Sequence, residues 1–202
     1  MILPQSFYAR PAREVAQALL GKTLVRVLAD VSLSGVIVET EAYCDSKELD
    51  LACHGARNKG QPTRRSATMF GPPGHAYVYF TYGMHWMMNV VTGRDGQPNA
   101  VLLRALEPSG GLDLMSQRRP GRKLGEWTNG PAKLTQALSI DHRLNGLALY
   151  PPGGSIWIED GAALSLQEIR RGPRVGLGKT PEPWFSKPWR FWVADNKYVS
   201  RR

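Results

Sequence analysis

Residues 75–91 have the sequence HAYVYFTYGMHWMMNVV, which is rich in aromatic and β-branched residues and contains the turn signal Tyr82-Gly83. The stretch predicts two strands, His75–Phe80 and Met84–Val91, joined at that turn. An aromatic ring beside a glycine at the tip of a hairpin is in a position to protrude. This stretch is the most informative part of the sequence.

The sequence on either side of the hairpin predicts more strands and a few short helices. Further strands are expected at Lys22–Leu28, Gly35–Ala42, Ala100–Ala105, Ser155–Ile158, Ala163–Arg170, Arg174–Gly178 and Trp189–Val193. Helices are expected between Pro11 and Gly21, over Gly111–Arg119, and from an N-cap at Asn129 with Pro131 in the first turn. Residues 43–74 form a loop of a length that is usually functional or disordered. Because strands follow one another directly, we expect an α+β fold: one domain over residues 1–202, with a mixed or antiparallel sheet and flanking helices.

The composition excludes several classes of protein. With 42% hydrophobic and 21% charged residues, the 202-residue chain is not intrinsically disordered, and its 21 glycines and 15 prolines argue against a helical bundle. The net charge of +9 is unevenly distributed, since residues 1–54 carry −2 and residues 55–202 carry +11. Such a field favours a polyanionic partner, either nucleic acid or a membrane surface, although a basic protein without such a partner fits the charge equally well.

The cysteine content and the first residues of the chain bear on disulfides, metal sites and cellular location. Two cysteines, Cys44 and Cys53, are too few for a disulfide scaffold or a four-cysteine zinc site. Together with His54 and His75 they show neither CxxC nor HExxH spacing, so we expect no metal. The start lacks the features of a signal peptide, and polar residues and prolines interrupt the uncharged run 66–93. We therefore expect no membrane span and a cytoplasmic, reducing location, at the nucleoid if the source is bacterial.

A pair of carboxylates near the end of a predicted strand is the first candidate for chemistry. In Glu39-Thr-Glu41-Ala-Tyr43, alternation puts Glu39, Glu41 and Tyr43 on one face. A carboxylate beside an aromatic side chain, at the start of a long loop, could act as a general base, and two like charges on one face could raise one pKa. The alternative is a solvated strand face.

Basic and aromatic residues are interleaved around the hairpin. Tyr77 and Tyr79 share one strand face, and they follow a basic segment that contains Arg57, Lys59, Arg64 and Arg65. This pattern suits a nucleic-acid groove, in which protruding or flat aromatic rings unstack or hold a base. The alternatives are a tyrosine-rich strand packed on the core and a solvated basic surface. Two further basic clusters contain Arg118, Arg119, Arg122 and Lys123, and Arg170, Arg171, Arg174 and Lys179.

Across nearly its whole length the sequence resembles the alkyladenine (3-methyladenine, N-methylpurine) DNA glycosylase family. The matching runs, in the family's order, are VETEAY (38–43), DLACH (50–54), MFGPPGHAYVY (69–79), YGMH (82–85), LLRALEP (102–108), NGPAKL (129–134) and RVGLG (174–178). One run would be weak evidence, whereas seven in order are highly specific.

The resemblance implies a curved, largely antiparallel sheet and hydrolysis of the N-glycosidic bond of alkylated or deaminated purines in duplex DNA, without metal or lyase chemistry. We also expect no cofactor, and a monomer, because binding one lesion needs only one copy of the chain. Glu41 matches the residue that activates the attacking water, and Arg104 and the carbonyl of Val175 match groups that hold that water. The matches for the base pocket are Tyr43, Ala52, His54, Tyr79 and Asn89. The resemblance places Tyr82 in the gap left by the flipped base with Met84 beside it, and we expect DNA contacts from Tyr77, Arg57, Arg64 and Arg65.

The sequence departs from the family pattern at two places. The family's usual Thr-Pro-Arg-Asn is Thr63-Arg64-Arg65-Ser66 here, and Met87 stands where a cysteine is common. These departures concern loop conformation and the pocket wall. Two alternative functions are a basic module that binds nucleic acid without catalysis and a hydrolase of small nucleosides or sugars.

Overall fold

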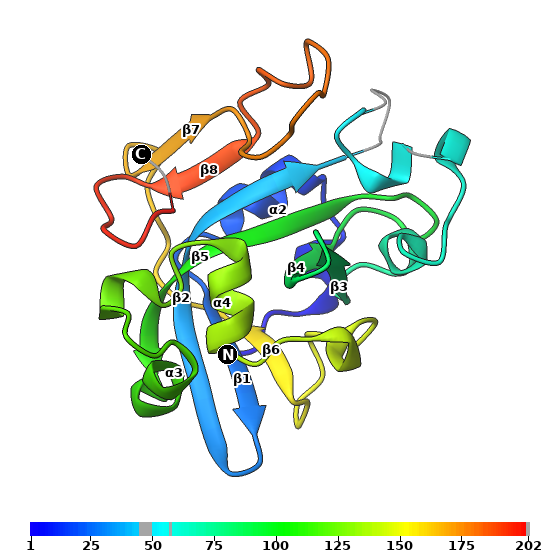
Figure 1. The fold of residues 1–202 in the computed structure, drawn as a ribbon. Helices are drawn as coiled ribbons and strands as arrows, with labels where there is room; N and C mark the ends of the chain where they lie inside the picture. The colour runs from blue at the N-terminus through cyan, green and yellow to red at the C-terminus, as the bar shows by residue number, and fades with distance from the viewer. Residues whose placement is uncertain (45–49, 57, 201–202) are drawn as a thin grey trace.

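The computed structural model describes residues 1–44, 50–56 and 58–200, which form an eight-stranded antiparallel sheet with short helices around it (Figure 1). Six strands follow the order β3-β4-β5-β2-β1-β6, while β8 pairs with β2 and β7 pairs with β8. Their bounds are β1 Thr23–Leu28, β2 Val31–Tyr43, β3 Ala76–Thr81, β4 His85–Val91, β5 Ala100–Gly110, β6 Ile156–Glu159, β7 Ile169–Gly172 and β8 Arg190–Val193. The predicted α+β class with a largely antiparallel sheet is confirmed.

The long strands β2 and β5 form the centre of the sheet and bend across the molecule (Figure 1). Their register shifts between Ile37 and Glu39 and again between Glu39 and Thr40, as at a β-bulge. Bulges bend a strand and re-aim its side chains. Over Glu39–Glu41, β2 also pairs with β8 on its other edge. The carboxylates predicted on this strand therefore lie between two neighbouring strands, away from any sheet edge.

Short helices lie on both sides of the sheet. They are α1 Gln5–Tyr8, α2 Ala12–Ala18, α3 Leu112–Arg118 and α4 Pro131–Ala137, with 3-10 turns at His54–Ala56, Asn58–Gly60, Ala67–Phe70, Leu124–Glu126 and His142–Leu144. In Figure 1, α2 lies behind β2 and β5, and α4 lies in front of the sheet. The Thr40 hydroxyl donates to the carbonyl of Ala16 in α2 at 2.8 Å. Thr40 therefore faces α2, and its neighbours Glu39 and Glu41 face the opposite side of the sheet.

The predicted hairpin is present, with its tip at Tyr82-Gly83. Thr81 pairs with His85, and the amide of Met84 donates to the carbonyl of Thr81 at 3.2 Å. Tyr82 and Gly83 both have positive φ, 52° and 67°, as the central residues of a type I′ turn do, within the three-residue connection between β3 and β4. The Tyr82 side chain is 76% exposed.

Two of the predicted strands are wrong or misplaced. Over the expected strand Ala163–Arg170, only Ile169 and Arg170 belong to β7. The preceding residues form a turn in which the Glu168 carboxylate accepts from the amide and hydroxyl of Ser165. The expected strand Arg174–Gly178 is a loop, because Gly176 and Gly178 have φ of +79° and +58°, outside the extended region.

The predicted N-cap of the helix after residue 129 is also wrong by one residue. Gly130 occupies the N-cap of α4, and Pro131 begins the helix as expected. The Asn129 side chain instead accepts from the ammonium group of Lys133 at 2.7 Å. An asparagine that is engaged in this way does not cap the helix, and Gly130 takes a φ of 164° there.

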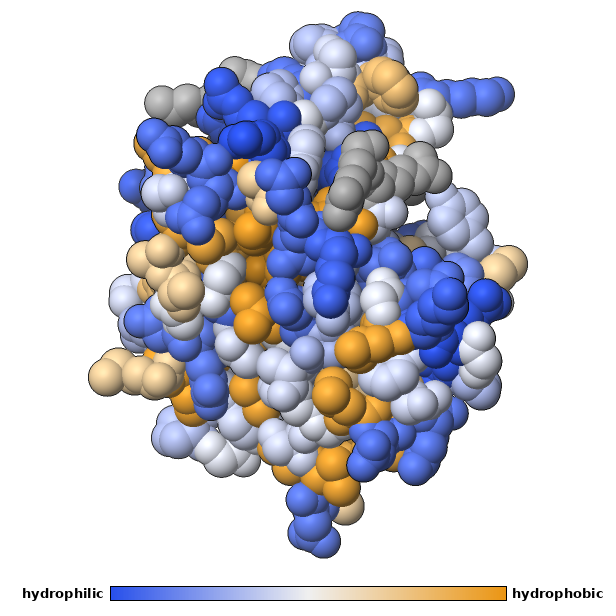
Figure 2. Space-filling view, turned by 90° about the vertical axis from the view of Figure 1, so that its left-hand side faces the viewer, coloured by the Kyte–Doolittle hydropathy of each residue, from blue (hydrophilic) through white to orange (hydrophobic). Residues whose placement is uncertain are grey.

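One face of the molecule is largely hydrophilic, with hydrophobic residues in separate groups between polar ones (Figure 2). None of the helices described here has the length and apolar character that crossing a bilayer requires.

The turn between β5 and α3 provides a test of the fold. Gly111 has a φ of +68°, and a β-carbon there would collide with the Leu33 side chain and lie 2.7 Å from the Ser32 carbonyl oxygen. Gly121 has nearly the same φ, +69°, with no atom within 4 Å. Both G111A and G121A should lose about 1–2 kcal/mol to the left-handed backbone, and G111A about 1–3 kcal/mol more to overpacking. Urea denaturation of both variants measures the difference, and equal losses would contradict this account of the turn.

Candidate active site

A cavity of about 520 Å³ opens beside the hairpin tip and collects most of the predicted site residues. It is bounded by the hairpin, by the loop that follows β2, by β5 and by the loop after residue 174. The predicted residues that line it are Tyr43, Ala52, His54, Arg65, Tyr77, Tyr79, Tyr82, Asn89, Arg104 and Val175. Residues separated by more than 130 positions in the sequence therefore meet at one place.

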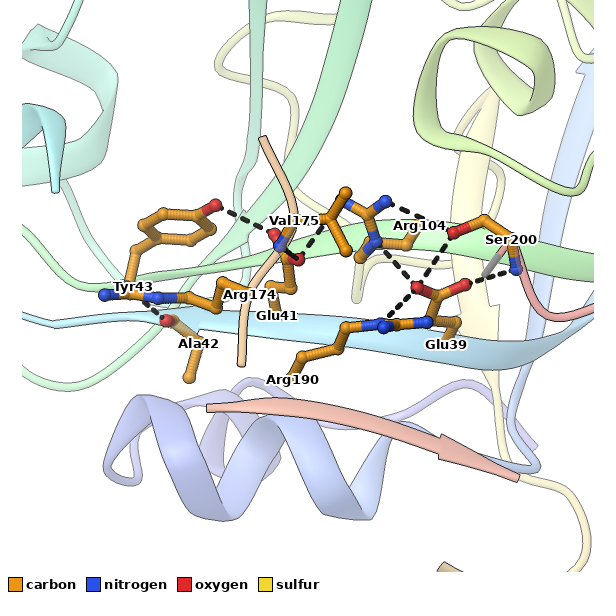
Figure 3. A network of polar contacts seen from close by, with 9 residues as sticks. All are labelled: Glu39, Glu41, Ala42, Tyr43, Arg104, Arg174, Val175, Arg190 and Ser200. Carbon is orange, nitrogen blue, oxygen red and sulfur yellow. Dashed lines mark hydrogen bonds and ion pairs between the residues drawn. The ribbon is translucent and has the colours of Figure 1, made fainter. Parts of the chain in front are cut away.

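Glu41 is fully buried and does not itself line the cavity, but it contacts Tyr43, Arg104 and Val175, which do (Figure 3). The amide of Val175 donates to its Oε1 at 2.6 Å, and the Tyr43 hydroxyl donates to its Oε2 at 2.8 Å. The Nη1 of Arg104 lies 3.2 Å from Oε1. Three donors from three different residues fix the orientation of this carboxylate. The alternative of a solvated strand face is therefore wrong.

Tyr43 remains a phenol in this arrangement. Burial and the neighbouring Glu41 carboxylate raise the pKa of Tyr43 well above its usual value. The hydroxyl therefore stays protonated and donates a hydrogen bond to Glu41. The prediction for Val175 concerned its carbonyl, whereas the contact in this structure is made by its amide.

Glu39, two residues before Glu41, is also fully buried and is paired with two arginines. Its Oε1 accepts from the Nε of Arg104 and from the Nε of Arg190, each at 2.7 Å. Burial alone would raise the pKa of Glu39, but Arg104, the amide of Ser200 and Arg190 outweigh it and lower that pKa. The rise that two like charges could produce is therefore not found at Glu39. The sequence analysis named Glu39 only as one of a pair of carboxylates with Glu41, and it assigned no role to Arg190 or Ser200.

Arg174 and Asp50 form a buried ion pair beside the cavity. Arg174 donates to both oxygens of Asp50, at 2.6 and 2.9 Å, and to the carbonyl of Ala42 at 3.0 Å. Its guanidinium lies 4.7 Å from the Tyr43 ring centroid. The prediction of Arg174 in an exposed basic cluster is wrong, because the ion pair fixes it inside the protein. Since Val175 follows Arg174 directly, the pair also holds the amide that contacts Glu41.

The aromatic residues of the cavity contact one another. The His54 Nδ1 and the Tyr77 hydroxyl lie 2.9 Å apart, and the rings of His54 and Tyr79 meet edge to face with centroids 4.7 Å apart. Tyr77, predicted among the DNA-contacting residues, is 1% exposed and supports His54 from the interior. The Asn89 amide donates to the carbonyl of Tyr77 at 3.1 Å, which fixes its orientation. The backbone amide of Ala52 donates to Asp50 at 3.0 Å.

The remaining predicted residues lie at the rim or beyond it. Tyr82 and Met84 are 76% and 66% exposed at the tip of the hairpin. Arg64 and Arg65 are exposed, and the guanidinium of Arg65 lies 4.7 Å from the centroid of the Tyr79 ring. Arg57 lies outside the described residues. Contacts of these arginines with DNA remain a prediction.

The described residues contain no group of three or more histidine, cysteine, aspartate or glutamate side chains that could hold a metal ion. Cys44 and Cys53 are free thiols, and both are buried.

The Asp50–Arg174 pair provides a stability test. D50A leaves a buried guanidinium without its carboxylate, which typically costs about 3–5 kcal/mol of unfolding free energy. The matched control is D160A, since Asp160 pairs with Lys22 at 2.7 Å but is 59% exposed, and that substitution should change stability little. Chemical denaturation measures both variants. A D50A protein as stable as D160A would show that the buried pair does not hold this loop.

Comparison with known proteins shows which family the chain belongs to. The sequence model of the methylpurine-DNA glycosylase family matches residues 6–197. The chain is 48% identical to a protein of Carboxydothermus hydrogenoformans over all of both chains. It is 46% identical to one of Methanocella arvoryzae, over 100% of this chain and 96% of the relative, and 42% identical to one of Bacillus subtilis, over 98% and 96%. Each of these relatives bears the name "Putative 3-methyladenine DNA glycosylase". The chain therefore belongs to the methylpurine-DNA glycosylase family, whose activity is hydrolysis of N-glycosyl bonds.

Proposed function

We propose that the protein is a monofunctional DNA glycosylase of base excision repair. It flips an alkylated or deaminated purine, such as 3-methyladenine, 7-methylguanine, hypoxanthine or ethenoadenine, out of duplex DNA. It then hydrolyses the N-glycosidic bond with a water activated by Glu41 and leaves an abasic site. The observation that carries the proposal is a buried, triply hydrogen-bonded carboxylate next to an aromatic cavity, with an exposed tyrosine at the rim.

Glu41 has two tasks in this mechanism. Breaking the bond to the base builds positive oxocarbenium character on the sugar, which a nearby carboxylate stabilises. The same carboxylate takes the proton of the attacking water. Its two oxygens together offer about four lone-pair sites, and Val175, Tyr43 and Arg104 use three of them. One acceptor position thus stays available for a water, which Arg104 and the Val175 carbonyl would help to hold.

The aromatic side chains bind the flipped base. His54 and Tyr79 contact each other and so act as one wall, and Tyr43, which approaches from β2, acts as the other. Electron-rich tyrosine faces favour a cationic base such as 3-methyladenine. The Asn89 amide, fixed by the carbonyl of Tyr77, crowds the 2-amino group of normal guanine. The backbone groups of Ala52 and His54 lie near the edge of the base.

The partner is duplex DNA, bound by a monomer. The excess of positive charge in residues 55–202 attracts the phosphates, and Arg57, Arg64 and Arg65 contact them near the lesion. Tyr82, with Met84 beside it, fills the space that the base leaves. Hydrolysis of small nucleosides would not require an exposed tyrosine, such as Tyr82, at the tip of an ordered turn. Binding DNA without catalysis would not require a buried carboxylate in contact with three residues of the cavity wall.

Replacement of Glu41 separates catalysis from binding. E41Q keeps the shape of the side chain but cannot accept a proton, so excision should fall by about 10²- to 10⁴-fold while affinity for lesion-containing duplex stays within about threefold of the original. The control is E14Q, at an exposed position of α2, which should excise normally. The measurement is single-turnover release of hypoxanthine or ethenoadenine, with abasic sites cleaved by alkali. Excision by E41Q within tenfold of the wild type would sink the assigned role.

Replacement of Tyr82 tests the hairpin tip. Y82A removes the side chain that fills the duplex gap, and since flipping costs a few kcal/mol, affinity for lesion DNA should fall by about tenfold or more. The control is L166A, because Leu166 is 82% exposed on another loop and should not affect binding. Fluorescence anisotropy with labelled duplexes gives both affinities. If Y82A binds as tightly as L166A, the tip does not enter the duplex.

A further inference from the structure

The guanidinium of Arg104 connects two carboxylates through different nitrogen atoms (Figure 3). Its Nε contacts the Oε1 of Glu39 at 2.7 Å, and its Nη1 lies 3.2 Å from the Oε1 of Glu41. Its Nη2 donates to the Ser200 hydroxyl at 3.2 Å. Because the guanidinium is planar and each of its three nitrogens has a partner, it cannot rotate without breaking contacts on the side away from Glu41.

Ser200 holds Glu39 in turn. Its amide donates to the Oε2 of Glu39 at 2.7 Å, and its hydroxyl donates to Oε1 at 2.9 Å. The segment that carries it is packed in place, since Tyr198 and Val199 are buried against Val38 of β2 and Ala105 of β5. A segment near residue 200 therefore reaches the neighbours of Glu41 through defined contacts.

Charge balance explains why a second buried acid is present. Arg104 and Arg190 both contact Glu39, and Arg104 also contacts Glu41, so two positive and two negative groups share this interior region. Buried ion pairs add little net stability compared with well-packed apolar residues. Here they fix the orientation of Arg104. Glu39 accepts from the Nε of Arg104 and from the Nε of Arg190, and the Nη1 of Arg104 then faces Glu41.

We propose that Glu39 and Ser200 are positioning residues for the proposed glycosylase reaction, because they fix Arg104 so that its Nη1 faces the Glu41 carboxylate and the attacking water. Glu39 does not contact the substrate and takes no proton during the reaction. This inference rests on the proposed function, and it adds a segment from the far end of the sequence to the catalytic centre.

Three variants test the inference. S200A removes one hydroxyl with two contacts and leaves the backbone amide on Glu39. E39Q removes the charge, and its NH₂ group would face the amide of Ser200 or the arginines. The matched control is E107Q: Glu107 on β5 also ties the same segment to the sheet, through Asn196 at 2.9 Å. Glu107 has no contact with Arg104 or Glu41 among the interactions described.

The single-turnover excision rate and the affinity for lesion DNA are measured separately. We expect S200A to lose about threefold to tenfold in rate, as for a typical lost hydrogen bond, and E39Q to lose tenfold or more. Both should bind lesion DNA within threefold of the wild type, and E107Q should be unchanged in rate. Thermal unfolding of each variant shows whether it is folded at the assay temperature. If E39Q is unfolded at that temperature, the comparison of S200A with E107Q tests the inference.

The pH dependence of the rate separates positioning from a loss of folded protein. The charged groups that face this cluster are Arg104 from β5, Arg190 from β8, and Arg174 beside Tyr43. A loss of folded protein lowers the excision rate and the amount of DNA bound together at every pH. A displaced Arg104 lowers the excision rate alone, so the ratio of rate to bound DNA, compared across pH for E39Q, S200A and the wild type, distinguishes the two.

Two outcomes are distinguishable. If wild-type protein releases no lesion base, the proposed function fails. If the wild type is active and folded S200A and E39Q excise at the rate of E107Q, the proposed function stands and the positioning role of Glu39 and Ser200 is overturned. A rate loss in E107Q equal to that in S200A would also overturn it, because anchoring of the segment alone would then explain the effect.

Discussion

The site depends on keeping two carboxylates, Glu39 and Glu41, inside the protein. Removing an ionised group from water costs several kcal/mol unless charges and donors replace the solvent. Here the replacements come from separate segments: Arg104 from β5, Arg190 from β8, and the amides of Val175 and Ser200. At Glu39–Glu41, β2 pairs with β5 on one edge and with β8 on the other. The same strand pairing that builds the sheet therefore brings the arginines to the buried carboxylates.

The buried pair of Asp50 and Arg174 connects this charged centre to the base cavity. Asp50 also accepts from the amide of Ala52, in the loop that continues to His54, while Arg174 precedes Val175. The loop after β2 and the amide that donates to Glu41 are therefore connected through the contacts of Asp50.

The hairpin and most strand positions could be predicted from the sequence, because alternation and turn residues are local signals. Glu41, Arg104 and the aromatic residues were predicted through the family resemblance. In the structure Arg104 and the aromatic residues line one cavity, and Glu41 is buried behind it in contact with Tyr43 and Arg104. The sequence could not reveal which side chains pair when they lie far apart along the chain. Arg174 resembles any exposed arginine in a basic run, and its partner Asp50 lies 124 residues earlier. Ser200 carries no local signal of its link to Glu39. The turn at 163–168 was mistaken for a strand because its Glu168–Ser165 contacts compete with sheet pairing.

The positive φ of Tyr82 has a consequence for the proposed function. A bulky residue in the left-handed region is held there by the surrounding hairpin, so the backbone entropy of the tip is lost when the protein folds and not when it meets DNA. In the proposed function, the backbone of the tip would then have the same conformation at every base step that it meets. The duplex would supply the motion, and the rate at which lesions are recognised would follow the spontaneous opening of weakened base pairs.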